Sequence, residues 1–256
     1  MQPKLIPMLM RLQFSSFMIG GALLLAGAGT ALSQTTNSIA IANHSFEAQS
    51  VTAGSYAVET PTSWSVVGPS AGVVAIVHPA SGDTRFSSYP PPGLDGTNSC
   101  QIYSTAGNDT GTVYQDLGSA NKYQAGVTYT LTANFGWEQD HNPPNSLLVF
   151  YNSSLVPIAS NSISASSLTQ NSFVTESVTY TATGTEGGNG DIVVGFTATG
   201  AAQATSFDFD NVSLVAVFPP GPAITNQPVS QGTLPGNAVV FSVGASAATG
   251  TALQYQ

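Results

Sequence analysis

The chain has 256 residues, a formal net charge of −9 and one cysteine. An acidic surface of this kind repels the phosphate backbone of nucleic acids and the anionic lipids of membranes, so neither is an expected partner. Because Cys100 is alone, an intrachain disulfide is excluded, and the fold must be stabilised by a hydrophobic core.

The first 33 residues have the layout of a secretory signal peptide. Lys4 and Arg11 give a basic start, the segment from Phe14 to Ala31 is uncharged and largely apolar, and small residues surround the expected cleavage point after Ser33. An uncleaved membrane anchor is the alternative, but the apolar stretch is near the lower length limit for a span and contains Gly and Ser. We therefore predict cleavage, a secreted or cell-surface protein, and no membrane insertion of the mature chain.

The next part of the chain shows short alternating runs and no sustained helical periodicity. From Val127 to Phe135 the odd positions are apolar and the even ones polar, as in a strand with one buried face. Residues 172–180 and 191–198 have similar patterns and are separated by a glycine-rich turn. Further strands are expected near residues 73–77, 98–103, 112–117, 146–151 and 206–217. This number of short strands indicates an all-β fold, an antiparallel jelly-roll β-sandwich.

Five segments, in order, resemble motifs of bacterial jelly-roll carbohydrate-binding modules, the galactose-binding-like sandwiches often appended to secreted glycosidases. The segments are Asn43–Glu47, Pro61–Trp64, Val113–Leu117, Ala125–Leu131 and Asp208–Leu214. Two positions depart from the family pattern, where Ser63 replaces a Gly and Asn211 replaces an Asp. The resemblance implies a non-catalytic module over residues 34–218. Its implied ligand is a neutral polysaccharide, since the acidic surface would repel anionic glycans. The alternative is a structural or adhesive spacer of a larger surface protein, without a small ligand.

The C-terminal part resembles a different family. The proline-rich run from Phe218 to Pro222 is typical of a linker between domains. Residues 223–228, 236–243 and 253–256 resemble the first strands of a bacterial immunoglobulin-like domain. We interpret residues 219–256 as a linker and an incomplete immunoglobulin-like sandwich, and we expect further domains beyond Gln256, because so few residues cannot bury a core.

Glu47 and Asp210 are the candidate metal ligands. In the carbohydrate-binding family, the first and last strands lie together and often hold a structural calcium ion. Alternation places Asp210 on the same strand face as Val212 and Leu214, which should be core. A buried carboxylate is costly unless a cation or hydrogen bonds compensate it, and calcium prefers oxygen ligands. We therefore predict one structural calcium ion. The alternative is that the carboxylates cap backbone N–H groups at the rim of the sandwich.

Six residues are candidate ligand contacts, because aromatic faces bind the apolar faces of sugar rings and polar groups bind their hydroxyls. They are Tyr56, Arg85, Phe86, Tyr89, Trp137 and Glu138. For the aromatic residues, anchoring of a loop or packing in the core is the alternative role. Glu138 opens a polar segment that ends at Asn142, which could bind hydroxyl groups, hold a metal ion or form a solvated loop.

Sequence signatures of enzymes are weak in this chain. Residues 68–72 match Gly-x-Ser-x-Gly, but that motif needs a strand before it and a helix after it, whereas an apparent strand follows here. The three histidines, His44, His78 and His141, show no metal-binding spacing. The sequence therefore predicts a protein that is not an enzyme.

Overall fold

The computed structural model describes residues 34–69, 72–105, 109–201 and 204–247. The predicted signal peptide, residues 1–33, lies outside the described residues, as does its cleavage point. Within the described ranges, no helix combines the length and apolar character needed to cross a membrane.

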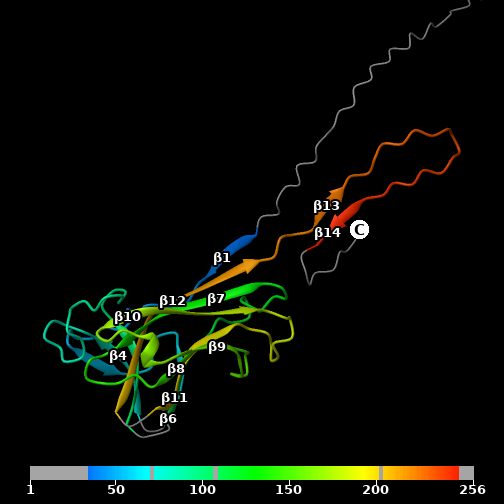
Figure 1. Cartoon of the computed structure of the whole chain (residues 1–256). Helices are drawn as coiled ribbons and strands as arrows, with labels where there is room; N and C mark the ends of the chain where they lie inside the picture. Colours follow the sequence, from blue (N-terminus) through cyan, green and yellow to red (C-terminus); the bar gives the residue numbers. More distant parts are fainter. Residues whose placement is uncertain (1–33, 70–71, 106–108, 202–203, 248–256) are drawn as a thin grey trace, which may run out of the picture. The chain divides into compact units, whose positions relative to one another are not determined.

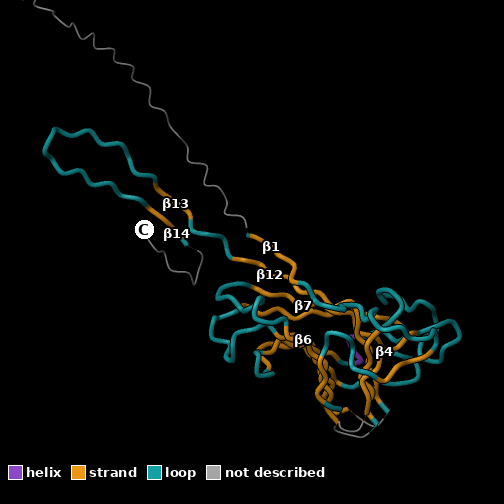
Figure 2. Tube along the Cα trace, turned by 180° about the vertical axis from the view of Figure 1, so that it is seen from behind, coloured by secondary structure: helices purple, strands orange, loops and turns teal. Residues whose placement is uncertain are grey.

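Two antiparallel sheets form the body of the protein (Figure 1). The first, sheet A, has the strand order β10 (Ser172–Thr181), β7 (Thr128–Trp137), β12 (Thr205–Phe218), β5 (Ser99–Ser104), β4 (Gly72–His78) and β2 (Ser55–Val58), and β1 (Thr35–Ile39) also pairs with β12. The second, sheet B, has the order β3 (Ser65–Val67), β6 (Asp109–Asp116), β11 (Val193–Ala201), β8 (Asn145–Tyr151) and β9 (Pro157–Ile163). One 3-10 turn, η1 (Ala165–Ser167), is the helical element of the described residues, and strands and loops make up the rest (Figure 2). The predicted β-sandwich of jelly-roll type is confirmed.

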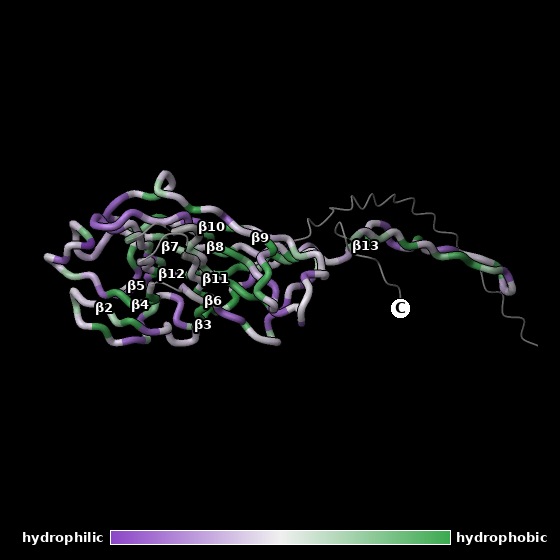
Figure 3. Tube along the Cα trace, turned by 90° about the horizontal axis from the view of Figure 1, so that it is seen from below, coloured by the Kyte–Doolittle hydropathy of each residue, from purple (hydrophilic) through white to green (hydrophobic). Residues whose placement is uncertain are grey.

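The hydrophobic core lies between the sheets and follows from the alternation seen in the sequence. Tyr129, Leu131, Ala133 and Phe135 of β7 are all at most 1 % exposed. Rings from both sheets meet in this layer, and those of Phe196 and Phe209 stack with centroids 3.9 Å apart. Figure 3 shows the hydrophobic segments running along strands of the sandwich and hydrophilic ones in many of the loops. Full burial of one large apolar side chain stabilises the folded state by about 1.5–3 kcal/mol. The core can therefore stabilise the fold without an intrachain disulfide.

A β-bulge in β12 changes which side chains face the core. The pairing of β12 with β7 shifts register between Asp210 and Ser213, and Asn211 adopts a left-handed φ of 48°. Before the bulge Phe209 points into the core, whereas after it Leu214 does. Asp210 therefore lies on the face opposite to the core, so its predicted placement beside the core residues is wrong.

The outer face of sheet A is covered by the loop that joins β4 to β5. In this loop Phe86 stacks on Phe173 of β10, with ring centroids 5.7 Å apart. Phe173 N donates to Pro92 O at 2.7 Å, and Asn134 Nδ2 of β7 donates to Gly93 O at 2.8 Å. These contacts hold the loop against the sheet and leave one end of the outer face free to form a pocket.

Residues after the sandwich form a small sheet of their own. β13 (Ala223–Asn226) pairs antiparallel with β14 (Gly244–Ser246). Several large apolar side chains between and within these strands are exposed: Ile224, Val229, Leu234, Val240, Phe241 and Val243.

Candidate functional site

Strand register places one row of side chains across the outer face of sheet A. Asp208 of β12 lies opposite Gly136 of β7 on one side and opposite Gln101 of β5 on the other. Gln101 pairs with Ala75, which pairs with Val58 of β2. Because side chains alternate along a strand, all of these point away from the core and toward the covering loops.

A pocket of about 550 Å³ lies over this face. Its floor is built from the strands and is largely aromatic and aliphatic: Tyr56, Val58, Val73, Gln101 and Tyr103. Its walls come from two loops and are polar: Asp83, Thr84 and Arg85 from one, and Glu138, Asp140 and His141 from the other. An apolar floor with a few convergent polar groups is typical of a site for a small organic molecule, and the volume falls in the range of such sites.

Hydrogen bonds between the two wall loops fix their positions. Gln139 N donates to Arg85 O at 2.7 Å, and Gln139 Nε2 donates to Thr84 O at 2.7 Å. Within its own loop, the Arg85 guanidinium pairs with Asp83, to which Arg85 Nε donates at 2.9 and 3.0 Å. Trp137 Nε1 donates to His141 O at 3.1 Å and so fixes the backbone of the loop that carries Glu138, Asp140 and His141. The walls are therefore preorganised.

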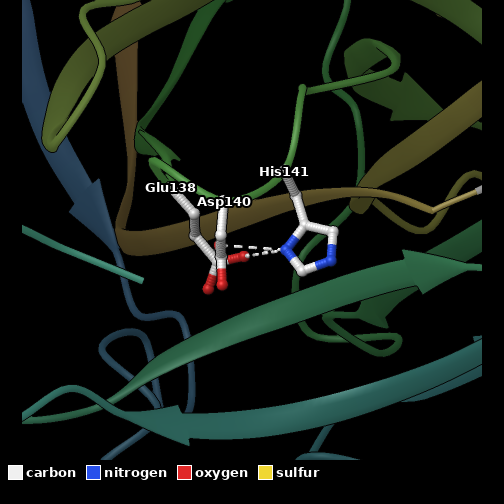
Figure 4. Close-up of side chains that lie close together, drawn as sticks. All are labelled: Glu138, Asp140 and His141. Carbon is white, nitrogen blue, oxygen red and sulfur yellow. Dashed lines mark hydrogen bonds and ion pairs between the residues drawn. The ribbon is translucent and has the colours of Figure 1, made fainter. Parts of the chain in front are cut away.

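Glu138, Asp140 and His141 gather their ionisable groups at one point of the wall (Figure 4). His141 Nδ1 lies 2.9 Å from Asp140 Oδ1 and 3.6 Å from Glu138 Oε2. Glu138 is only 1 % exposed, and Ser206 Oγ donates to its Oε2 at 2.7 Å. Burial raises the pKa of the Glu138 carboxyl group. Among the described residues, its second oxygen, Oε1, has no hydrogen-bond partner.

A second buried acid, Asp208, lies behind this wall. It is completely buried, and Ser99 Oγ donates to its Oδ1 at 3.2 Å. Its Oδ2 has no hydrogen-bond partner within the described part of the chain. Burial, and next the negative charge of Glu138, raise the pKa of Asp208 well above its ordinary value. A carboxyl group in such surroundings favours its neutral form, which can donate a proton.

Three of the six predicted ligand contacts, Tyr56, Arg85 and Glu138, line the pocket. Phe86 is 3 % exposed and anchors its loop on Phe173, which is the alternative role considered for it. Tyr89 is 43 % exposed and does not line the pocket. Trp137 is half-buried and supports the wall.

Sequence reasoning missed several lining residues, notably Val73, Gln101 and Tyr103. The alternation within predicted strands 73–77 and 98–103 gave the only available signal. It separates the two faces of a sheet, but it does not reveal that a loop encloses the outer one.

The candidate metal ligands Glu47 and Asp210 accept hydrogen bonds from one loop. Thr97 N and Asn98 N each donate to Glu47 Oε1 at 2.7 Å, and Asp95 N donates to Asp210 Oδ2 at 2.6 Å. Both carboxylates therefore accept backbone N–H groups at the rim, as in the alternative considered for them, and their role as calcium ligands stays a prediction. Burial raises the pKa of Asp210 to about 8. Among the described residues, one group of three potential ligands lies within reach of a single metal ion: Glu138, Asp140 and His141, whose ligand atoms all lie within 4.8 Å of one another.

A protein-family model described as HpiC1-like, HpiC1 cyclase, matches residues 37–215, well over half of the 256-residue chain. The chain belongs to the HpiC1-like cyclase family. The match spans β1 to most of β12 and so includes every strand that contributes to the pocket. No curated protein sequence gives a significant match.

Solved structures of cyclases share the fold of this HpiC1-like chain. The Stig cyclase Fisc from Fischerella sp. TAU, in complex with (3Z)-3-(1-methyl-2-pyrrolidinylidene)-3H-indole, superposes with a TM-score of 0.60 at 19 % identity over 71 % of this chain and 98 % of its own. A cyclase from Fischerella sp. TAU in complex with 4-(1H-indol-3-yl)butan-2-one gives a TM-score of 0.60 at 19 % identity over 70 % of this chain and 97 % of its own. An apo cyclase from Fischerella sp. superposes with a TM-score of 0.60 at 20 % identity, over 71 % of this chain and 96 % of its own.

The family match corrects the predicted function. The interpretation as a carbohydrate-binding module followed by an immunoglobulin-like domain is wrong, and so are its consequences: a non-enzymatic protein, a polysaccharide partner and a spacer role at the cell surface. The physical reason is that the five motifs describe strands and turns of a jelly-roll sandwich. Sandwiches with unrelated functions share such features, whereas function depends on side chains brought together on the outer face.

Proposed function

We propose that this chain is a cyclase that closes a ring within a small, largely apolar molecule held in the pocket on sheet A. The observation that carries the proposal is the pocket itself, which has an aromatic and aliphatic floor and an acidic wall in a chain of the HpiC1-like cyclase family. The two Fischerella cyclases with a named ligand each bind an indole compound, so indole-bearing substrates are the first class to test.

The lining suits an aromatic, unsaturated substrate. Tyr56 and Tyr103 offer ring faces and edges, and Val58 and Val73 exclude water from one side. Gln101 and Arg85 can hold a polar group of the substrate and fix its orientation. Such positioning brings two ends of one molecule together, which lowers the entropic part of the barrier to ring closure.

Asp208 is the proton source that this arrangement offers. It is completely buried and does not itself line the pocket, but it lies on the same sheet face, in register with the lining residue Gln101. Its Oδ2 is not engaged by the described residues. Transfer of its proton to a substrate double bond leaves a carbocation. A second double bond attacks that carbon and forms the new C–C bond. Loss of a proton from the resulting cation to the Asp208 carboxylate restores the acid, so the product is an isomer of the substrate.

Calorimetric titration with 4-(1H-indol-3-yl)butan-2-one tests the pocket. We expect saturable binding to the wild-type chain and about tenfold weaker binding to Tyr103→Ala, because loss of one aromatic contact costs about 1.4 kcal/mol. Tyr89→Ala, at an exposed aromatic outside the pocket, is the matched control and should bind like the wild type. Equal binding by all three proteins would exclude this pocket as the site.

Export of the chain and a structural calcium ion stay predictions. Export rests on the signal-like layout of the first 33 residues, and fractionation of a producing cell tests it. Calcium at Glu47 and Asp210 rests on their charge, the burial of Asp210 and the loop to which both bind, and a chelator tests it.

A further inference from the structure

The wall of the pocket contains three potential metal ligands of two chemical kinds. Glu138 and Asp140 offer carboxylate oxygens, and His141 offers a ring nitrogen. We propose that these three side chains bind one divalent transition-metal cation, of which Zn²⁺ and Co²⁺ are examples. This site goes beyond the cyclase function proposed above and does not depend on it.

The spacing of the ligand atoms fits such an ion. Zinc binds His nitrogen and carboxylate oxygen at about 2.0–2.2 Å, so two ligands lie about 3.4 Å apart at a tetrahedral angle and about 3.0 Å apart at a right angle. Nδ1 of His141 is 2.9 Å from Asp140 Oδ1 and 3.6 Å from Glu138 Oε2. These two separations lie close to those values, and Figure 4 shows both carboxylates facing Nδ1.

A buried oxygen without a partner points independently to a cation. Glu138 is only 1 % exposed, yet its Oε1 receives no hydrogen bond from the described residues. Ser206 compensates only the other oxygen, Oε2, and a buried carboxylate oxygen without a partner is costly. Arg85, in the adjoining wall loop, pairs its guanidinium with Asp83. A divalent cation between Glu138 and Asp140 would balance both charges.

Neighbouring side chains already hold Glu138 and His141 in position. Ser206 Oγ donates to Glu138 Oε2 at 2.7 Å, and Trp137 Nε1 holds the backbone of His141 through its carbonyl at 3.1 Å. The ring of Tyr103 contacts that of His141 edge to face, with centroids 5.4 Å apart. Outer contacts of this kind orient ligands before the ion arrives and strengthen binding.

The ligand set favours a transition metal over calcium or magnesium. Calcium and magnesium prefer oxygen ligands throughout, whereas a mixed set of one imidazole and two carboxylates suits Zn²⁺, Co²⁺, Mn²⁺ or Fe²⁺. Three protein ligands also leave a coordination position free, as in catalytic metal sites. Because all three residues line the pocket, an oxygen or nitrogen atom of a bound molecule could take that position.

A titration of the full chain with Co²⁺ tests the proposal, because bound Co²⁺ is read directly from its visible absorption. We expect saturable binding of one ion, and binding weakened by about tenfold or more in His141→Ala and in Asp140→Asn. Both side chains are partly exposed, at 29 % and 32 %, so the substitutions should leave the fold intact, which a thermal melt of each variant checks. His44→Ala, at an exposed histidine outside the pocket, is the matched control and should bind like the wild type.

Two outcomes would overturn the metal site. One is the absence of saturable Co²⁺ binding by the folded wild-type chain. The other is Co²⁺ binding that survives unchanged in both folded variants. In either case the contact between His141 and Asp140 would be a plain hydrogen bond. Neither outcome bears on binding of the indole probe, which is measured without metal.

Discussion

Gly136 of β7 provides a sharp test of how the outer face of sheet A is packed. A Cβ atom at this position would lie 2.7 Å from Phe173 Cε1, 2.8 Å from Phe173 Cζ and 3.0 Å from Asp208 Cβ. Its φ is not in the left-handed region, so Gly136→Ala adds a steric conflict without backbone strain. Overpacking of this kind costs about 1–3 kcal/mol.

The expected loss of stability is large enough to measure by thermal melting. For a domain of this size, each 1 kcal/mol lowers Tm by roughly 2–4 °C, so Gly136→Ala should melt about 2–12 °C below the wild type. Because Phe173 stacks on Phe86, displacing its ring should also loosen the loop that carries Arg85. We therefore expect weaker binding of the indole probe as well.

Two further proteins make the Gly136→Ala result interpretable. In Gly221→Ala the new Cβ meets nothing within 4 Å, so that variant should melt like the wild type. Phe173→Leu removes the two ring atoms nearest to the new Cβ, so Gly136→Ala should cost less in that background than alone. A Gly136→Ala protein that melts within about 1 °C of the wild type would refute the described packing of this face.

The remaining predictions concern the acid, the core, pH and calcium. Asp208→Asn should still bind the indole probe but should form no cyclised product, which product analysis measures. Full activity of this variant would exclude Asp208 as the proton source. Phe209→Ala, at a core ring that is completely buried, should lower the free energy of unfolding by about 3–5 kcal/mol in urea denaturation. Burial raises the pKa of Glu186, but hydrogen bonds from Thr183 N and the Tyr180 hydroxyl outweigh it and lower that pKa below 4.5. The stabilising contribution of Glu186 is therefore complete above pH 4.5 and is lost as the pH falls through the lowered pKa. The free energy of unfolding of Glu186→Gln should fall less steeply with decreasing pH than that of the wild type. If an ion links Glu47 and Asp210, a calcium chelator should lower the Tm of the wild type and leave the Tm of Glu47→Gln unchanged. A wild-type Tm that does not respond to the chelator would argue against that ion.

The sequence was sufficient for the sandwich because its core strands carry a simple period. The alternation from Val127 to Phe135 predicted both the strand β7 and its buried face. The alternation failed for Asp210, because the bulge between Asp210 and Ser213 changes the face on which the following side chains lie. No local sequence pattern marks that bulge. Short exposed strands such as β2, Ser55–Val58, bury too little apolar surface to show a period and were not predicted.

The site was predictable only in part, for a related reason. The polar cluster from Glu138 to Asn142 stood out in the sequence, and three of its residues do line the pocket. Their partners Gln101 and Tyr103 looked like ordinary outward-facing strand residues. They become functional candidates because the loop that precedes β5, anchored by Phe86 on β10, folds back over their face of the sheet and encloses it.

Product analysis shows whether this chain closes rings in small molecules. The full chain is incubated with indoles that carry a side chain with two double bonds, and the mixture is separated by liquid chromatography with mass detection. Ring closure is an isomerisation, so we expect a new compound of unchanged mass with one double bond fewer, formed by the wild type and not by Asp208→Asn. If the substrate stays unchanged in the presence of folded wild-type protein that binds the indole probe, the chain is not a cyclase for this class of molecule.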